Sequence, residues 1–143
     1  MTEKTEAKQT RKVRFSLDAQ AWTSLAVFMT FGLLFEGLIG YRSPSYLNDP
    51  MRRELFRLAH AHGTILSLLL LVADQYLASH SLSIPRLAYL SLRIGAVIMP
   101  IGFLLGGSSH TETDPHFLII LSPIGGILLI FGTISLSIAS LKK

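Results

Sequence analysis

Four long runs of apolar residues dominate the sequence, at about 19–40, 55–78, 86–107 and 116–139. Most charged residues lie before, between or after these runs. Each run matches the roughly 20 residues that a helix needs to cross the hydrocarbon core of a bilayer. The pattern therefore predicts an all-α membrane protein with four transmembrane helices.

The connections between the runs are short. Helices joined by short connections lie antiparallel to each other, so we predict an up-down bundle. Residues 1–15 are polar and charged and are expected to form a flexible cytoplasmic tail. Residues 16–143 then form a single four-helix transmembrane domain.

Capping residues predict where the helices begin. Ser16 or Asp18 is expected to cap the first helix, and Asp114, which precedes a proline, suits the start of the last one. The segment 41–53 contains two prolines and is expected to be a loop. The second helix would then start near Glu54.

The composition narrows the class of protein further. Hydrophobic residues make up 50% of the chain and charged residues only 15%, which favours a lipid bilayer as its surroundings. The basic residues flank the apolar runs and form no patch interleaved with aromatics, which argues against nucleic acid as a partner. Because the chain has no cysteine, disulfides, thiolate metal sites, iron–sulfur clusters, covalently attached haem and cysteine catalysis are excluded.

Lysine and arginine predict the orientation, because they are enriched in cytoplasmic loops. Eight of them would lie on the side of the two termini, namely Lys4, Lys8, Arg11, Lys12, Arg14, Arg86, Lys142 and Lys143. Four would lie on the other side, namely Arg42, Arg52, Arg53 and Arg57. We therefore expect both termini in the cytoplasm and the chain in a bacterial inner (plasma) membrane.

Four of the five histidines fall at the outer ends of the predicted helices: His60, His62, His110 and His116. Glu36 lies about one turn from the outer end of the first helix. Imidazoles and carboxylates gathered at membrane depth are suited to hold haem b or a transition metal, or to relay protons. The sequence therefore predicts a functional site near the outer face.

Helical phase ranks these histidines, because residues two apart on a helix point in nearly opposite directions. His60 shares its face with small and polar residues, which predicts that it points into the bundle. His62 shares its face with leucines, which predicts that it points towards lipid. We expect His60 and His116 to be the haem or metal ligands, with His110 as the alternative to His116. Glu36 would be the proton carrier or a partner of a ligand.

Two further features concern packing. Asp74 and Arg93 fall at comparable depths on adjacent helices, which predicts an ion pair, because either charge alone would be costly to bury. Glycines recur on the first, third and fourth helices and permit close helix contact, namely Gly32, Gly37, Gly40, Gly95, Gly102, Gly106, Gly125 and Gly126. The glycine-rich faces also suit a membrane-protein partner or a homodimer.

The segment 58–63, Leu-Ala-His-Ala-His-Gly, opens the second helix directly after an outer loop. It resembles the His-x-His segment in small relatives of the haem–copper oxidase and nitric-oxide-reductase subunit. The resemblance is confined to this part of the chain and implies a haem-binding role for His60 or His62. The adjacent histidine pair of that family's copper site is absent here, so the resemblance implies a lone b-type haem rather than a reaction centre.

The chain is also similar to hydroxylaminobenzene mutase, another small protein with four spans. In both, a histidine opens the second span after a loop with proline and arginine. That resemblance implies an isomerase of small aromatic substrates. The leading hypothesis is a small haem- or metal-binding membrane protein in electron transfer or redox chemistry. The alternatives are a non-enzymatic accessory or assembly subunit of a larger membrane complex, and a small-molecule membrane enzyme or transporter.

Overall fold

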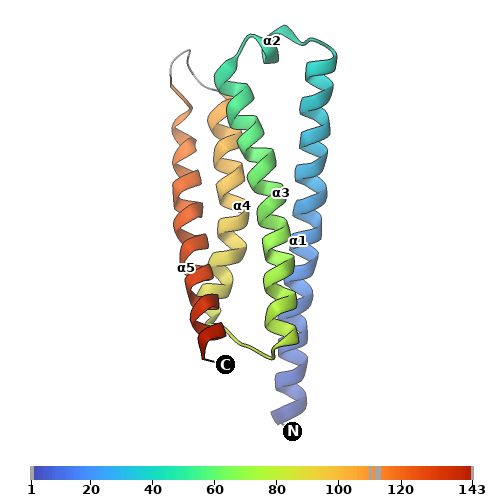
Figure 1. Cartoon of the computed structure of the whole chain (residues 1–143), viewed down its shortest axis with the longest axis vertical. Helices are drawn as coiled ribbons and strands as arrows, with labels where there is room; N and C mark the ends of the chain where they lie inside the picture. Colours follow the sequence, from blue (N-terminus) through green and yellow to red (C-terminus); the bar gives the residue numbers. More distant parts are fainter. Residues whose placement is uncertain (1, 110, 112–113, 143) are drawn as a thin grey trace.

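A computed structural model describes residues 2–109, 111 and 114–142 of the chain, with side chains from residue 18 onward. The elements in chain order are α1 (Thr2–Gly40), α2 (Pro44–Leu47), α3 (Pro50–Ser79), α4 (Arg86–Ser108), the 3₁₀ turn η1 (Phe117–Ile120) and α5 (Leu121–Leu141) (Figure 1). Four of the described helical segments are long and apolar enough to cross a membrane: α1 from Asp18 onward, α3, α4, and η1 together with α5. The protein is therefore an all-α integral membrane protein, as the hydropathy pattern predicts.

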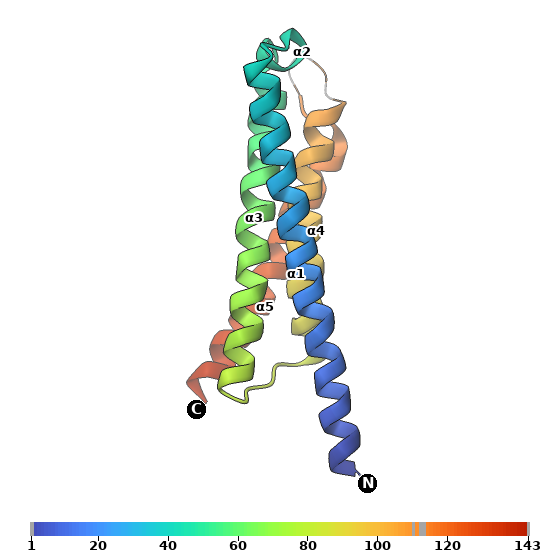
Figure 2. The same ribbon diagram turned by 90° about the vertical axis from the view of Figure 1, so that its right-hand side faces the viewer.

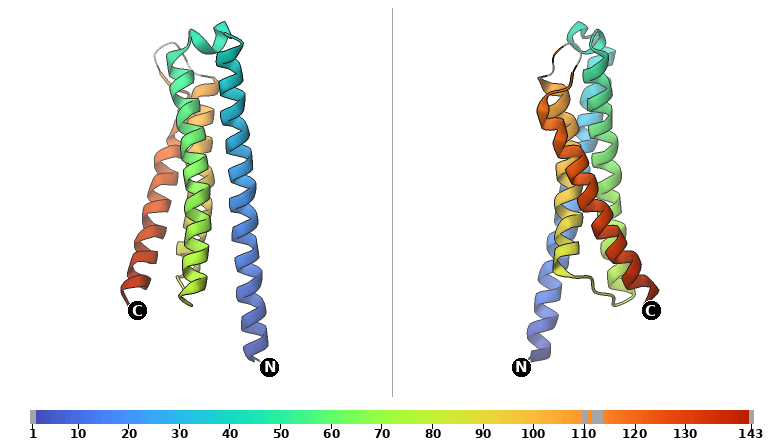
Figure 3. Two further views of the ribbon diagram at one scale, coloured as in Figure 1. Left: turned by 45° about the vertical axis from the view of Figure 1, so that its right-hand side comes forward. Right: turned by 90° about the vertical axis from the view of Figure 1, so that its left-hand side faces the viewer.

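The long helices run up and down and pack on their neighbours in chain order. Helix α1 packs mainly on α3, α3 on α4, and α4 on α5, so α1 and α5 form two opposite edges of the molecule (Figures 1 and 3). Figure 2 looks onto the α1 edge, with α3 and α4 behind it. Both chain termini lie at one end of the bundle, called here the terminal end, and α2 lies at the other, called the α2 end. The predicted up-down bundle is confirmed.

Small residues let the helices approach closely at the contacts between them. A Cβ atom added to Gly125 of α5 would lie 2.6 Å from the backbone nitrogen of Met99 in α4, and one added to Gly95 would lie 2.7 Å from the carbonyl oxygen of Gly125. The predicted packing role of these glycines is confirmed. Gly37 and Gly40 of α1 and Gly126 of α5 make no such contact within the described chain, because an added Cβ at these positions would meet nothing within 4 Å.

Three helix boundaries differ from the prediction. Helix α1 begins at Thr2, not near Ser16 or Asp18, because residues 3–14 are mostly strong helix formers that continue the helix of the span. Helix α3 begins at Pro50, where the side chain of Asp49 accepts a hydrogen bond from the Arg52 backbone N–H at 2.9 Å.

The expected loop 41–53 also contains the short helix α2, Pro44–Leu47. At the start of the last span, the predicted cap Asp114 is not the capping residue. The residue before η1, His116, accepts a hydrogen bond from the Leu118 N–H instead.

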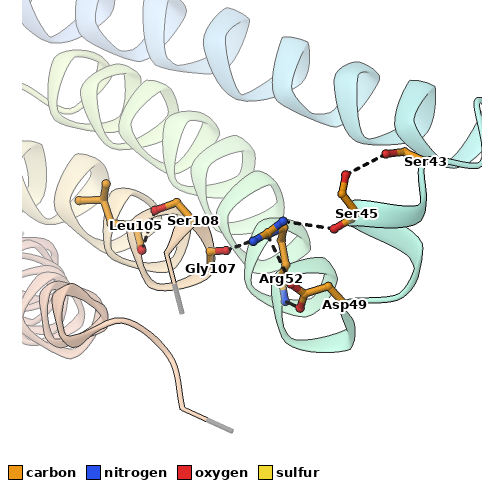
Figure 4. A network of polar contacts seen from close by, with 7 residues as sticks. All are labelled: Ser43, Ser45, Asp49, Arg52, Leu105, Gly107 and Ser108. Carbon is orange, nitrogen blue, oxygen red and sulfur yellow. Dashed lines mark hydrogen bonds and ion pairs between the residues drawn. The ribbon is translucent and has the colours of Figure 1, made fainter. Parts of the chain in front are cut away.

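An arginine network closes the α2 end of the bundle (Figure 4). The Arg52 guanidinium donates from Nε to the carbonyl oxygen of Gly107 at 3.2 Å and from Nη1 to that of Ser45 at 3.2 Å. It also lies 3.5 Å from the Asp49 carboxylate. Arg52 therefore ties the first turns of α3 to α2 and to the last turns of α4.

Candidate functional site

His60 lies on α3 at its contact with α1. Its ring nitrogen Nδ1 is 2.7 Å from the backbone carbonyl oxygen of Phe28. A Cβ added to Gly32 would lie 2.7 Å from Nδ1 and 2.9 Å from Nε2 of His60, so the imidazole occupies the space that a side chain at this glycine would fill. The predicted inward direction of His60 is confirmed, and its inward neighbour is α1.

The hydrogen bond to Phe28 fixes the proton on the His60 ring. A carbonyl oxygen only accepts hydrogen bonds, so Nδ1 must carry the hydrogen, and in the neutral ring Nε2 keeps its lone pair. A histidine whose Nδ1–H is held by a backbone carbonyl presents Nε2 in the arrangement common among metal- and haem-ligating histidines. His60 is therefore chemically prepared to act as a ligand or as a proton acceptor.

Glu36 lies on α1 one turn beyond Gly32, the residue that the His60 ring covers. Phe28, Gly32 and Glu36 follow one another at four-residue spacing and so share one face of α1. Nδ1 of His60 lies against the Phe28 carbonyl oxygen, and the ring lies over Gly32, one turn before Glu36. The Glu36 side chain is exposed at the surface of the chain. The structure thus places the predicted carboxylate on α1, one turn from the glycine that packs against the predicted histidine of α3.

Two arginines lie on the face of α3 that carries His60. Arg53 and Arg57 precede His60 by seven and three residues, which places all three along one stripe of the helix. Arg57 pairs with Glu54 at 3.5 Å on the surface, where such a pair contributes little stability. Burial raises the pKa of Tyr46 in α2, and the positive charges of Arg53 and Arg57 partly offset this rise. The face of α3 that carries His60 is therefore positively charged towards the α2 end, through Arg53 and Arg57.

Thr64 lies one turn beyond His60 on the same face. Its hydroxyl oxygen is buried and has no hydrogen-bond partner in the described part of the chain. Six other serine and threonine hydroxyls in the spans donate to the carbonyl oxygen four residues earlier: Thr23, Thr30, Ser67, Ser91, Thr133 and Ser135. A buried hydroxyl that makes no such bond is costly. Thr64 is thus a polar group that sequence reasoning did not single out, and it lies next to His60.

His62 faces α4, the neighbour of α3 on the side away from α1. Its Nδ1 is 2.9 Å from the carbonyl oxygen of Leu58, and the centre of its ring lies 5.0 Å from that of Phe103 on α4. The prediction that His62 points towards lipid is therefore wrong, because Phe103 gives the imidazole an aromatic partner inside the protein. The two histidines of the His-x-His segment thus have their contacts on different helices.

His116 lies at the α5 edge and makes its contacts within its own turn. Its Nδ1 accepts a hydrogen bond from the Leu118 N–H at 3.4 Å, and its ring packs against Phe117. In the neutral ring the hydrogen is therefore on Nε2, so this form of His116 donates hydrogen bonds and has no lone pair left for a metal. His110 lies outside the described residues.

No group of three or more histidine, aspartate or glutamate side chains in the described part of the chain is arranged to hold a metal ion. His60 has its contacts on α1, whereas His116 has its contacts beside α4. The pairing of His60 with His116 as ligands stays a prediction.

A second polar cluster lies nearer the terminal end. Arg93 of α4 donates from Nε to the Gln20 side-chain oxygen at 2.6 Å, and the Gln20 amide donates back to the Arg93 carbonyl oxygen at 2.8 Å. Asp74 of α3 is only 2% exposed. Sequence reasoning identified Asp74 and Arg93 but missed Gln20, which links α1 directly to α4. The Asp74–Arg93 ion pair stays a prediction.

The reciprocal hydrogen bonds between Gln20 and Arg93 predict an energetic coupling. Replacing both residues by leucine is expected to cost less than the sum of the two single replacements, by about 0.6 and at most about 1.7 kcal/mol. Unfolding of the four proteins in mixed detergent micelles would measure this difference. A second double-mutant cycle serves as the control, with Arg93 and Gln75, an exposed amide on α3, each replaced by leucine. In this cycle the effects of the two single replacements on stability are expected to add. Equal coupling in both cycles would contradict the link.

Comparison of the chain with protein-family models, with curated proteins and with solved structures gives no match.

Proposed function

We propose that this protein binds a b-type haem on the flank of the α1–α3 contact, where His60 would hold the iron through Nε2. The observation that carries the proposal is the hydrogen bond between His60 Nδ1 and the Phe28 carbonyl oxygen, because it reserves Nε2 for a ligand. Haem supplies one-electron redox chemistry when bound. The role that follows for the protein is electron transfer or redox chemistry in the membrane.

The surrounding residues fit a haem better than a bare metal ion. One imidazole with one exposed carboxylate is a small ligand set for a transition metal, whereas a single histidine suffices to hold a haem iron. Arg53 and Arg57 lie on the same face of α3, towards the α2 end, and would pair with the haem propionates. Apolar side chains of the two spans would enclose the macrocycle. Glu36 would carry a proton to or from the site or bind a ligand group.

The orientation of the chain is part of the proposal. The excess of lysine and arginine at the terminal end supports cytoplasmic termini in a bacterial inner membrane. The α2 end, with His60 and Glu36 nearby, would then face outwards. The haem would lie near the outer face, where its propionates reach the headgroup region.

An absorption spectrum of the detergent-purified protein tests this function. We expect a Soret band that shifts when dithionite reduces the sample, with iron found by metal analysis of the same sample. Expression with added haem precursor guards against incomplete loading. A colourless protein without iron under these conditions would contradict the proposal, and a bound metal without a Soret band would replace haem by a simple metal centre.

A second candidate is a role as an accessory or assembly subunit of a larger membrane complex. The observation that favours it is the open surface at Gly37 and Gly40, where the helix has room for a close neighbour that the described part of the chain does not supply. Purification in a mild detergent distinguishes the two. Stoichiometric co-purification of another subunit with a colourless chain would favour the accessory role.

A further inference from the structure

Asp74 is a buried carboxylate in the part of α3 that is apolar and long enough to cross the membrane. The residue is only 2% exposed and lies five residues before the end of this span at Ser79. His60 lies fourteen residues away in the other direction, roughly 21 Å along the helix. The proposed haem site therefore does not use this carboxylate. An ionisable side chain buried in a span is costly and is typical of groups that pair with a charge or carry protons.

The groups at the level of Asp74 follow from the register of the helices. Two contacts set this register: Gly63 with Phe28 on α1, and His62 with Phe103 on α4. Both neighbours run antiparallel to α3, so counting along the helices places positions 17 and 91 at the level of Asp74. The charged and titratable residues within two positions of these are Asp18 on α1 and Tyr89 and Arg93 on α4. On α3 itself the next ones are Tyr76, which points to the opposite side of the helix, and His80 at its end.

Arg93 supplies a fixed positive charge at this level. Its Nε donates to the Gln20 side-chain oxygen at 2.6 Å, and the Gln20 amide donates back to the Arg93 carbonyl oxygen at 2.8 Å. The guanidinium keeps its charge, and Gln20 is neutral, so these two bonds do not depend on the charge of Asp74. Asp74 can therefore gain or lose a proton while the link between α1 and α4 stays in place.

A proton is the ligand that this arrangement suits best. Asp74 offers one carboxylate, whereas a metal cation such as Ca²⁺ takes about six to eight oxygen ligands. The charge of Arg93 also repels any further metal cation. A proton needs only one carboxylate oxygen. Arg93 stabilises the ionised form of Asp74 and burial stabilises its neutral form, so neither form is excluded.

We propose that Asp74 is a proton-exchange site, which takes up and releases a proton inside the membrane with Arg93 as its counter-charge. The proton comes from water at the terminal end, binds to a carboxylate oxygen and returns by the same way, so no electron or further reactant is involved. The terminal end is the nearer source of water, because five residues of α3 separate Asp74 from Ser79 and twenty-four separate it from Pro50. This site goes beyond the proposed haem function and does not depend on it.

An apolar carbodiimide tests the site, because dicyclohexylcarbodiimide enters the membrane and reacts with carboxyl groups in their protonated form. The tryptic peptide 58–86 contains Asp74 as its single acidic residue, whereas Glu36 belongs to the separate peptide 15–42. We expect the label on peptide 58–86, measured by mass spectrometry, to increase by up to about tenfold per pH unit as the pH falls from about 8 to about 5. A charged, water-soluble carbodiimide should leave this peptide unlabelled, because Asp74 is buried.

Two arginine variants test the counter-charge. Arg93→Gln should increase the labelling of Asp74 near neutral pH by about tenfold or more, because the ionised form loses its positive partner. Arg86→Gln is the matched control and should leave the labelling unchanged, since Arg86 is exposed at the start of the same helix. Its tryptic peptide then extends to Arg93 and still contains no other acidic residue. The pH series on the natural chain needs no variant and remains decisive if a variant does not fold.

Sealed vesicles of both orientations test the access. The labelling of Asp74 should follow the pH on the side of the chain termini, and dependence on the pH at the α2 end would overturn the proposed route. Peptide 58–86 without label at every pH would show that Asp74 is permanently ionised, and labelling that does not change with pH would equally overturn the exchange. Labelling by the water-soluble reagent would place Asp74 in contact with water, and an unchanged Arg93→Gln would remove the counter-charge. Because the reaction needs no haem, a colourless protein that is labelled as expected contradicts the proposed function alone.

Discussion

Replacing Gly125 by alanine is expected to destabilise the protein strongly, whereas the same change at the next residue should have almost no effect. The added methyl group at position 125 would lie 2.6 Å from the backbone nitrogen and 2.9 Å from the Cα of Met99. Because these are backbone atoms, no side-chain rotation relieves the contact and α5 must move away from α4. Overpacking of this kind costs about 1–3 kcal/mol, and we expect a value at the upper end of this range.

Gly126→Ala provides the matched control, since an added Cβ there meets nothing within 4 Å. Its expected effect is within about 0.5 kcal/mol, with a small gain from helix propensity. Reversible unfolding in mixed micelles, or the melting temperature in one detergent, measures both variants under the same conditions. Equal destabilisation would show that α4 and α5 do not approach each other as closely as described here.

The sequence was sufficient to predict the architecture because the hydrophobic effect of the bilayer acts on long stretches of chain. Four apolar runs can cross a membrane only as helices, and short connections leave an up-down arrangement. The helix starts were harder to predict, because several local signals compete. Asp114 before a proline is a good cap by type, yet His116 caps the 3₁₀ turn. The charged residues before Asp18 are helix formers that extend α1 to Thr2.

The candidate site could be predicted only in part, because helical phase gives a direction and does not identify the neighbour. Phase places His60 on the small and polar face of α3, and its contact with α1 confirms this. The same reasoning assigns His62 to lipid, since its stripe is rich in leucine. The neighbour on that side is Phe103, forty-one residues later in the chain, and no local pattern reveals such a contact.

Contacts between helices distant in sequence also explain the polar groups that were missed. Gln20 looks like an ordinary interfacial residue until α1 is placed against α4, where it bonds to Arg93 in both directions. Thr64 is unremarkable by type, and only the packing of the helices shows that its buried hydroxyl oxygen has no hydrogen-bond partner in the described part of the chain. The type of a residue thus indicates which chemistry its side chain can perform. The neighbouring helix decides which hydrogen-bond partner that side chain meets.

Replacing His60 by alanine is expected to abolish the Soret band, whereas His62→Ala should retain it. Both imidazoles donate from Nδ1 to a backbone carbonyl, but only His60 lies on the face of α3 that carries Arg53 and Arg57. The His62 ring is occupied by its contact with Phe103. Haem content per protein, from the pyridine haemochrome spectrum, measures both variants, and size-exclusion chromatography confirms that each remains folded. Equal loss in both would contradict the assignment of the two faces.

A pair of glycine substitutions tests the position of the His60 ring without removing the imidazole. Gly32→Ala places a methyl group where the ring lies, so Nδ1 must move from the Phe28 carbonyl oxygen and the orientation of Nε2 is lost. Loss of such an orienting bond weakens ligand binding about 10- to 100-fold. Gly37→Ala, on the open side of the same helix, should bind haem as the natural chain does. If Gly32→Ala retains full affinity while His60→Ala loses it, His60 binds haem without the hydrogen bond to Phe28. The Nδ1–H tautomer held by Phe28 would then be unnecessary for binding, while His60 would remain the ligand.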